Sequence, residues 1–273
     1  MTPLSLDIVI VSYNTAPDLD RCLASIVAHP PVGLAHVFVV DNGSSDGSPE
    51  LVRERYPAVD LIALSQNVGF GAANNVALTR SAATYVLLLN SDTIVPAGAI
   101  GRLLERLQAT RAAVAGPRLV DDHGRGEVSF GRMLSPIGEL RQQWRTWAAS
   151  RDSAWARRYR GRLLAHEREV DWVSGACMLL VREAAVEAGL FDERYFLYEE
   201  DVDLCAAIRA IGGRVLFTPA ADVLHRRGQS SRAAGVRPSV HYDRSHVLFY
   251  EKHRPVWAPV LRLWLRLGGR RIQ

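Results

Sequence analysis

The stretch YVLLLNSDT, residues 85–93, decides the fold that this sequence predicts. Its first five residues are almost continuously apolar, and three polar residues follow at once: Asn90, Ser91 and Asp92. A short apolar run with such an abrupt end is typical of a strand buried on both faces of a parallel sheet. One acidic residue after a strand is ordinary in a loop, so its meaning depends on how the other strands end.

Two other predicted strands also end in polar residues. LDIVIVSYN ends in Ser12, Tyr13 and Asn14, and HVFVVDNGSSDGS carries Asp41 directly after its apolar run. Segments with helical spacing separate the strands, so that the first 120 residues follow a βαβαβαβ order. This order predicts an α/β fold with a mostly parallel, Rossmann-like sheet flanked by helices and joined by right-handed crossovers.

The three polar clusters fall on the same edge of the predicted sheet. Ligands of open α/β sheets bind outside the carboxyl ends of the strands. A carboxylate at Asp41 can accept hydrogen bonds from a ribose or a base, and Asp92 offers a hard oxygen ligand for Mg²⁺ or Mn²⁺ bridging phosphate oxygens. Each cluster alone also fits common turn chemistry, but the three together predict a binding pocket.

The loop NVGFGAANN follows the third predicted strand and opens a helix. Gly69 and Gly71 allow close approach of the backbone to a ligand, and Asn67 and Asn74 are candidates to position that backbone. The pattern GxGxxN does not follow the first strand and lacks the acidic residue of a dinucleotide fingerprint. The loop therefore does not predict a dinucleotide site.

A second acidic cluster, YEEDVDLC, lies at the start of a predicted helix. Acidic residues in a first helical turn are common because they complement the helix dipole. Asp201, however, precedes Leu204 by three residues and Ile208 by seven, which places it along the edge of the buried face. We therefore expect Asp201 to face a cleft as a general base beside Glu200, and Asp203 to face away.

The third cluster is VLHRRGQSS, in which His225 ends a predicted strand. A lone histidine is more often a structural residue than a ligand. Close to Asp92, however, His225 would complete a metal site, and Arg226 or Arg227 would contact phosphate.

Taken in order, seven motifs resemble those of family-2 inverting glycosyltransferases, and most closely the rhamnosyltransferase-like branch of bacteria. They are VIVSYN, VVDNGSSDGS, NVGFGAANN, LLLNSD, WVSGACMLL, FDERYFLYEEDVDLC and H-x-x-G-x-S, spread over residues 6–231. Single motifs of this set are weak, but their order is specific. The resemblance implies a GT-A fold, a nucleoside-diphosphate-sugar donor and a divalent cation.

The resemblance also implies roles for individual residues. Ser12, Tyr13 and Asp41 would line the nucleoside pocket, and NSD would take the place of the DxD motif, with Asp92 as the metal ligand. Asp201 would be the catalytic base and His225 a metal or diphosphate contact. The WVSGA segment would form the edge facing the donor sugar and the acceptor; its residues are Trp172, Ser174, Gly175 and Ala176. Asn90 departs from the first Asp of DxD, which puts its contact with the metal in doubt.

Composition places the protein in a broad class. The chain has 273 residues and a formal net charge of +4, and Lys252 is its only lysine. The arginines form no compact basic motif, so no nucleic-acid partner is expected. Three widely spaced cysteines suit a reducing compartment, and no run is long enough for a membrane span, so we expect a cytoplasmic protein.

The predicted domain covers residues 1–231 and has three parts. Residues 1–120 form the nucleotide-binding half, 121–170 an Arg/Trp-rich insertion and 171–231 the acceptor and catalytic half, an elaboration at the C-terminal side of the sheet. The insertion is either a flap over the acceptor or a segment that faces a membrane. Residues 232–273 form a helical tail.

The tail has a helix with two alternative environments. Trp257, Leu261, Trp264 and Leu265 fall on one helical face with arginines beside them. Such a helix either lies on the inner face of the plasma membrane or packs on the protein body with its arginines at the surface. The first alternative would suit a lipid-linked acceptor.

The sequence therefore predicts a metal-dependent inverting glycosyltransferase. It would move a sugar, with rhamnose as one candidate, from a nucleoside-diphosphate sugar to a hydroxyl of a glycan or lipid-linked glycan in cell-surface polysaccharide synthesis. Two alternatives remain open. One is a sugar nucleotidyltransferase, although the first strand lacks its usual Gly-rich basic loop. The other is a non-catalytic relative that binds nucleotide sugars, although the Glu200–Asp201 pair is intact.

Overall fold

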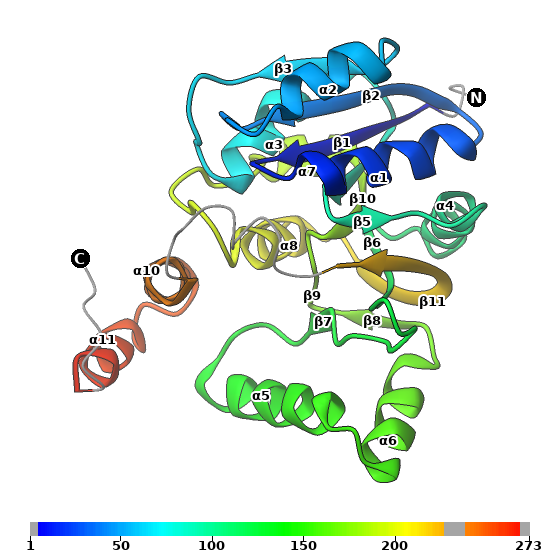
Figure 1. Ribbon diagram of the computed structural model, residues 1–273. Coiled ribbons are helices and arrows are strands. Elements are labelled where there is room, and N and C mark those ends of the chain that lie inside the picture. The colour runs from blue at the N-terminus through cyan, green and yellow to red at the C-terminus, as the bar shows by residue number, and fades with distance from the viewer. Residues whose placement is uncertain (1–4, 227–237, 268–273) are drawn as a thin grey trace.

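A mixed β-sheet runs through the centre of the molecule, with helices on both of its faces (Figure 1). The computed structural model describes residues 5–226 and 238–267. The strands are β1 (Leu6–Ser12), β2 (Leu34–Asp41), β3 (Asp60–Ala63), β4 (Tyr85–Asn90), β5 (Thr93–Ile94), β6 (Val114–Val120), β7 (Phe130–Gly131), β8 (Arg168–Val170), β9 (Trp172–Val173), β10 (Cys177–Val181) and β11 (Val215–His225). The helices are α1 (Ala16–Ala28), α2 (Ser48–Arg55), α3 (Phe70–Arg80), α4 (Ala99–Thr110), α5 (Pro136–Ser150), α6 (Ala154–Leu164), α7 (Arg182–Glu187), α8 (Glu200–Ala210), α10 (Pro238–His253) and α11 (Ala258–Leu267).

The strand order confirms the predicted, mostly parallel sheet. The main sheet has the order β3-β2-β1-β4-β10-β6-β11-β5, and β8 pairs with β11. The six strands β3, β2, β1, β4, β6 and β11 run in one direction, while β10 is antiparallel to both of its neighbours. A separate antiparallel pair, β7 and β9, lies below the sheet in Figure 1.

Two apolar cores hold the helices against the sheet. On one face, α1 and α4 contribute buried residues such as Leu23 and Leu103. On the other face, α3 and α8 contribute residues such as Leu78, Leu204 and Ile208. Because every strand side chain of β1 is buried, the sheet is covered on both sides, as its continuous apolar runs predict.

Three features differ from what the sequence pattern predicts. The segment VDWVSGACMLLVRE, residues 170–183, predicts one strand but contains the end of β8, then β9 and β10, and the start of α7; a turn at residues 174–176 separates β9 from β10. The insertion, with its weak helical pattern, forms two helices, each capped by a serine: Ser135 accepts from the Gly138 amide and Ser153 from the Ala156 amide. Ile211 does not belong to the buried face of α8 and is 43% exposed, since the helix ends at Ala210.

The C-terminal helices pack against α8 and the segment before it through a third apolar cluster. Phe249 and Tyr250 of α10 are buried there together with Tyr195 and Val202, and Leu261 of α11 packs against it. The predicted apolar face of α11 is therefore divided. Leu265 is buried, whereas Trp257 and Trp264 remain 48% and 62% exposed. Within the described ranges, no helix is both long and apolar enough to cross a bilayer.

Candidate active site

The parallel strands bring their polar ends together. The strand register sets Ser12 beside Asp41 and Val11 beside Asn90, so the ends of β1, β2 and β4 lie next to one another. The backbone amide of Asn90 also donates to the carbonyl of Ala176, at a distance of 3.0 Å. This contact joins the donor side of the predicted pocket to the WVSGA segment.

Some of the predicted pocket residues point into the protein. Ser12 and Ser91 are fully buried, and the hydroxyl of Thr15 bridges them at 3.0 and 2.8 Å. This chain of hydroxyl groups ties the ends of β1 and β4 together. The hydroxyls of these two serines are therefore held in the interior, where they fix the ends of the two strands.

Asp41 has a different environment. Its Oδ2 accepts the Ser44 amide at 2.9 Å, while its Oδ1 is buried and lacks a protein hydrogen-bond partner. A buried acceptor without a partner is costly, so a bound donor group at this point would stabilise it. Asn14, with φ of 51°, accepts the Ser45 amide and fixes the same loop, and Tyr13 beside it is half-buried.

The glycine loop is held by asparagines, one of which was not singled out from the sequence. Asn42 bonds to Asn67 Oδ1 and to the carbonyl of Gly69, and its own Oδ1 accepts the Val68 amide. Gly69 has a φ of 95°, and a Cβ there would lie 2.5 Å from the carbonyl oxygen of Phe196. The close approach of these two backbones explains the glycine.

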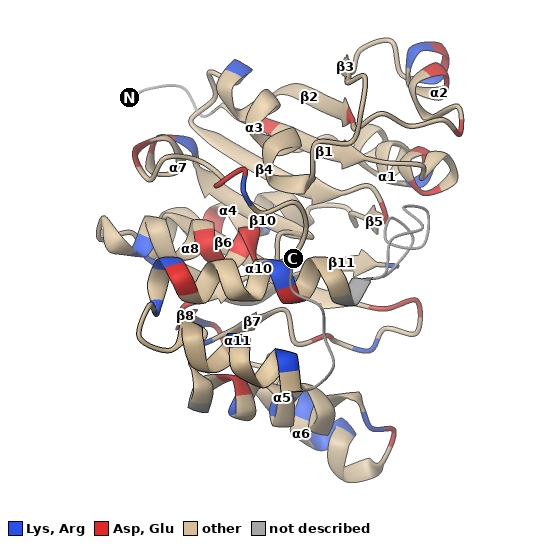
Figure 2. Ribbon diagram, turned by 90° about the vertical axis from the view of Figure 1, so that its left-hand side faces the viewer, with Lys and Arg blue, Asp and Glu red and all other residues tan. Residues whose placement is uncertain are grey.

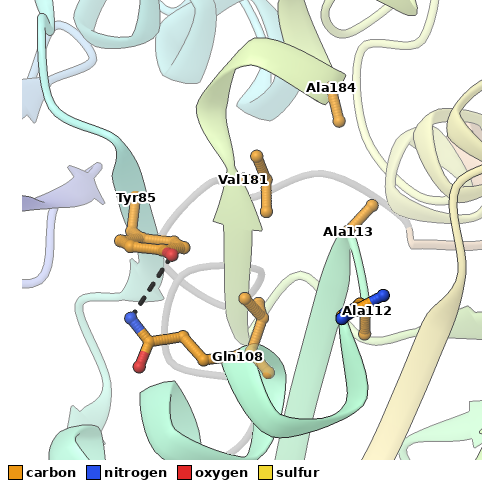
Figure 3. A pocket seen from close by; sticks show the side chains of 8 residues that line it. Tyr85, Gln108, Ala112, Ala113, Val181 and Ala184 are labelled. Carbon is orange, nitrogen blue, oxygen red and sulfur yellow. Dashed lines mark hydrogen bonds between the residues drawn. The ribbon is translucent and has the colours of Figure 1, made fainter. Parts of the chain in front are cut away.

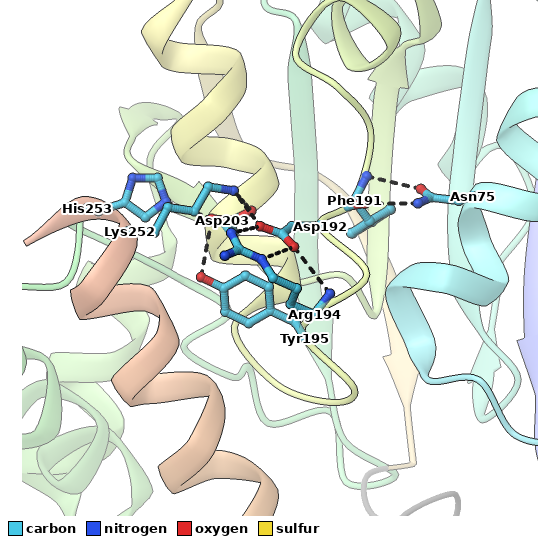
Figure 4. A network of polar contacts seen from close by, with 8 residues as sticks. All are labelled: Asn75, Phe191, Asp192, Arg194, Tyr195, Asp203, Lys252 and His253. Atoms are coloured by element: carbon cyan, nitrogen blue, oxygen red, sulfur yellow. Dashed lines mark hydrogen bonds and ion pairs between the residues drawn. The ribbon is translucent and has the colours of Figure 1, made fainter. Parts of the chain in front are cut away.

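The two asparagines that follow the loop have separate contacts. Asn74 donates to the carbonyl of Phe70 in its own helix, and its Oδ1 is buried without a hydrogen-bond partner. Asn75 exchanges two hydrogen bonds with the backbone of Phe191 (Figure 4). Asn75 therefore ties α3 to the segment that leads to α8.

The predicted base lies next to the WVSGA segment. Asp201 is half-buried; its Oδ2 accepts the Gly175 amide at 2.8 Å and its Oδ1 the Val202 amide at 2.8 Å. Burial raises the pKa of Asp201, although both amides favour the charged form. Burial and the neighbouring Asp201 raise the pKa of Glu200 still further. A carboxylate whose pKa is raised toward neutrality suits general-base chemistry.

Asp203 does face away from Asp201, as predicted, but toward α10 rather than solvent. It is 1% exposed and contacts Lys252 and His253 (Figure 4). Two acids of one helix thus have different partners: Asp201 accepts backbone amides beside the WVSGA segment, and Asp203 contacts Lys252 and His253 of α10.

The remaining acceptor-side residues are structural in part. The indole of Trp172 donates to the carbonyl of Arg132, and its ring covers Gly131, where a Cβ would lie 2.7 Å from the ring. The Ser174 hydroxyl accepts the Ala176 amide at 3.3 Å, within the turn that carries Gly175. Ser174 therefore supports the turn against which Asp201 rests, and Trp172 ties the strand before that turn to β7.

Strand pairing brings together the two predicted metal ligands. His225 pairs with Thr93 across β11 and β5, and its Nε2 lies 3.4 Å from Asp92 Oδ1. That oxygen is buried without a protein hydrogen bond. Glu127, which sequence reasoning missed, lies 3.5 Å from the other ring nitrogen.

The donor set fits a divalent cation. Burial alone would lower the pKa of His225, but Asp92 and Glu127 raise it to about 9, so a bound cation and the proton of the ring would compete. In the parts of the chain that the structure describes, no three Asp, Glu, His or Cys side chains are arranged to hold a metal ion. Two protein ligands, a carboxylate and an imidazole, are enough when phosphate oxygens and water complete the shell.

Part of the third motif lies outside the described residues. Arg227, Gly228 and Ser230 belong to this part, so their predicted contacts stay predictions. Arg226 is described, and its guanidinium donates to Asp122 at 2.8 Å.

A pocket of about 550 Å³ occupies the opposite edge of the sheet (Figure 3). Tyr85, at the start of β4, and Val181, at the end of β10, are among its lining residues. Its lining is mostly apolar and includes no carboxylate. The polar carboxyl edge therefore remains the candidate site.

The chain is similar to known glycosyltransferases. It matches the profile of Glycosyl transferase family 2 over residues 7–185. It is 33% identical to an N-acetylglucosaminyl-diphospho-decaprenol L-rhamnosyltransferase of Mycobacterium tuberculosis, over 96% of this chain and 89% of the relative. An N-acetylglucosaminyltransferase of Mesorhizobium japonicum is 36% identical, over 48% of this chain and 32% of that protein.

Solved structures have the same fold. A crystal structure of GalNAc-T7 with UDP, GalNAc and Mn²⁺ matches with a TM-score of 0.66 at 18% identity, over 91% of this chain and 48% of that one. The mannosyltransferase PcManGT of Pyrobaculum calidifontis, in complex with GDP-Man and Mn²⁺, matches with a TM-score of 0.59 at 18% identity, over 94% and 68%. The fold is therefore the GT-A fold. The profile match and the nearly full-length relative place the chain in glycosyl transferase family 2.

Proposed function

We propose that this glycosyltransferase moves L-rhamnose from a nucleoside-diphosphate sugar to a hydroxyl of an N-acetylglucosamine that is carried on a polyprenyl diphosphate. The family assignment favours glycosyl transfer over the nucleotidyl transfer that the sequence left open. The relative from Mycobacterium tuberculosis supports the choice of sugar and acceptor, since the alignment spans nearly the whole of both chains. The observation that carries the proposal is the arrangement of two carboxylates, Asp92 and Asp201, around the end of β4.

The donor would lie across the ends of β1, β2 and β4. The partnerless Oδ1 of Asp41 would accept a hydrogen bond from the nucleoside, with Tyr13 beside it. Asn90 and the loop around Gly69 would lie along the diphosphate. Asp92 and His225 would hold a divalent cation, which when bound neutralises the charge of the leaving diphosphate.

Asp201 would act as the base. Its carboxylate takes the proton of the acceptor hydroxyl while that oxygen attacks the anomeric carbon from the face opposite the diphosphate, which inverts the configuration. The Gly175 amide holds the carboxylate in place, and its hydrogen bond keeps Oδ2 oriented. Proton transfer of this kind contributes typically about 10²–10⁴-fold to a rate.

Product formation tests the assignment. The purified protein is incubated with nucleoside-diphosphate L-rhamnose and a short-chain polyprenyl-diphospho-N-acetylglucosamine, with Mn²⁺ or Mg²⁺, and the product is followed by mass spectrometry. Addition of one deoxyhexose is expected, with turnover reduced about 10²–10⁴-fold in Asp201→Asn. Near wild-type turnover in that variant would refute the role of Asp201, and no transfer to this acceptor would refute the acceptor.

A lipid-linked acceptor requires the protein to reach a membrane surface. We propose that one end of the molecule, formed by α5, α6 and α11, provides this contact (Figure 1). Its exposed large apolar residues are Leu140, Trp144, Trp147, Trp155, Val256, Trp257, Val260, Leu263, Trp264 and Leu267. Figure 2 shows basic residues on the same helices. Tryptophan beside arginine on an amphipathic helix suits the interface of an anionic membrane.

Sedimentation with vesicles tests this contact. The protein is expected to sediment with vesicles that contain anionic lipid at low salt, and less with zwitterionic vesicles. Trp264→Glu should weaken sedimentation, whereas Val32→Glu, at a site 85% exposed in the loop after α1, should not. Equal sedimentation of both variants, or none of the wild type, would refute the contact.

A further inference from the structure

A strained turn comes directly before the helix that carries the proposed base. Tyr198 and Glu199 have φ values of 70° and 64°, in the left-handed region that disfavours side chains with a Cβ. A residue in this conformation is energetically unfavourable and persists only where its surroundings fix it. Since α8 begins at Glu200, this turn sets the position of Asp201.

Residues far away in the sequence fix the turn. His246 of α10 contacts Glu199 through Nδ1, at 2.6 Å from Oε1. Its Nε2 lies 3.1 Å from Oε2 of Glu139 in α5. Tyr250, one turn further along α10, donates its hydroxyl to the other oxygen of Glu139. His246 is 5% exposed, so these contacts lie in the interior.

The network also places a positive charge beside the acidic turn. Burial favours a neutral ring, but Glu139 and Glu199 raise the pKa of His246 to about 10, so the ring is a cation at neutral pH. Burial raises the pKa of Glu199, and His246 opposes this effect. The groups that face the histidine are Glu139 from α5, Glu199 from the turn, and Tyr242 and Tyr250 from α10. The cation therefore supports the ionised form of Glu199, whose pKa the charges of Glu139 and Asp201 also raise.

A second set of contacts joins α10 to α8, at a different place from His246. Lys252 and His253 of α10 contact Asp203, and Lys252 also contacts Asp192 (Figure 4). These contacts face the side of α8 that points away from Asp201. The α10 helix therefore offers one cation, His246, that contacts the turn before the base, and another, Lys252, that contacts Asp203 on the far side of the base helix and Asp192 in the segment ahead of it.

We propose that His246, held by Glu139, is a positioning residue that fixes the strained turn at Glu199 and so keeps the acceptor base in its productive orientation. The inference rests on the proposed role of Asp201 as base. It gives the C-terminal helix a part in the reaction beyond packing. It also predicts that α5 and α10 affect turnover without touching the donor.

The test compares two cations of the same helix. His246→Gln removes the charge at the turn, Lys252→Gln removes the charge on the far side, and His246→Lys restores a positive donor. Turnover, the KM for the donor and the pH dependence of kcat/KM are measured with the substrates named above. Melting temperatures of all variants are measured in parallel.

His246→Gln is expected to lower kcat at least about tenfold with little change in the KM for the donor, because a misplaced catalytic group slows the chemical step alone. The acid limb of its kcat/KM profile should move to higher pH, since a base displaced from the Gly175 amide loses a hydrogen bond that favours its charged form. Lys252→Gln should lower the melting temperature but keep the wild-type pH profile. His246→Lys should recover part of kcat.

Wild-type kcat and pH profile in His246→Gln would overturn the proposal, as would equal kinetic effects of His246→Gln and Lys252→Gln. If His246→Gln does not fold, Glu139→Gln is measured in its place, with the same criteria. Asp201→Asn separates the two levels of inference: full activity in that variant refutes the base itself. Inactivity of that variant beside an unaffected His246→Gln refutes only the positioning role.

Discussion

Replacing Asp203 by asparagine tests how α10 is attached to α8. Asp203 is 1% exposed and accepts from His253 Nε2 at 2.6 Å, from Lys252 Nζ at 2.9 Å and from the Tyr195 hydroxyl at 3.3 Å. Asparagine keeps the volume of the side chain but removes its charge. The variant thus isolates the electrostatic part of the attachment.

The expected cost follows from the exposure of the partners. Breaking a buried ion pair by removing one member costs about 3–5 kcal/mol. The side chains of Lys252 and His253 are 32% and 22% exposed, so water can solvate them once the charge is lost. Asparagine also retains an acceptor for one of the three donors, and a hydrogen bond to a charged group is worth about 1.5–3 kcal/mol. We therefore expect the free energy of unfolding to fall by about 2–3 kcal/mol.

Urea unfolding followed by circular dichroism measures this change, and an unchanged m-value would show that the unfolding reaction is the same. The control is Asp222→Asn, which breaks a surface pair with Arg118 in which Asp222 is 42% exposed. That change should cost no more than about 1 kcal/mol. A loss in Asp203→Asn no larger than in the control would refute the idea that this ion pair anchors α10.

Three further predictions concern the site and its supports. In thermal unfolding, Gly69→Ala should destabilise the protein more than Gly124→Ala. Both glycines have a positive φ, but only at Gly69 would the new Cβ meet a backbone atom. Equal losses of stability would contradict the close approach of the Gly69 and Phe196 backbones. A nucleoside diphosphate at about a hundredfold excess over Kd should stabilise the protein by about 2.7 kcal/mol in the presence of Mn²⁺, and Asp92→Ala should abolish the part that needs the metal; a metal-dependent shift that survives would exclude Asp92 as a ligand. Urea unfolding of the wild type and of His246→Gln gives the stability that His246 adds. This contribution should be complete below about pH 6.5 and lost toward pH 10, because the pKa of His246 in the folded state is raised to about 10. A difference in stability that does not change with pH would argue against the ion pairs.

The sheet and its functional edge were predictable because their signals are local. Apolar runs and helical spacing between residues 6 and 120 predict the strand and helix order, and topology alone brings the polar strand ends to one edge. Helical spacing also predicts that Asp201 and Asp203 lie on opposite sides of their helix. The structure agrees with the strand order and turns Asp203 toward α10, away from Asp201, while the cleft at Asp201 stays a prediction.

Other features depend on contacts that no sequence period encodes. A serine after a strand gives no sign that its hydroxyl turns inward, as it does at Ser12 and Ser91. Glu139 and Tyr250 are 111 residues apart, and neither lies in a recognisable motif. Helices α5 and α6 have weak apolar periodicity, yet Ser135 before proline and Ser153 before alanine are ordinary N-cap signals that would have marked their starts.

The donor and acceptor sides of the proposed site are built in different ways, and we expect this difference to bear on specificity. The family profile ends at residue 185, before Asp201, His225 and α10. The donor side is made from consecutive parallel strands whose ends meet automatically, so it needs little from the rest of the chain. The proposed acceptor side instead depends on the antiparallel strand β10, on the strained turn at Glu199, and on α5 and α10, whose side chains hold that turn. A change of acceptor can therefore arise in these later segments while the donor edge remains intact. For this reason, exchanging α5 or α10 between relatives should alter acceptor choice and turnover before it alters nucleotide binding.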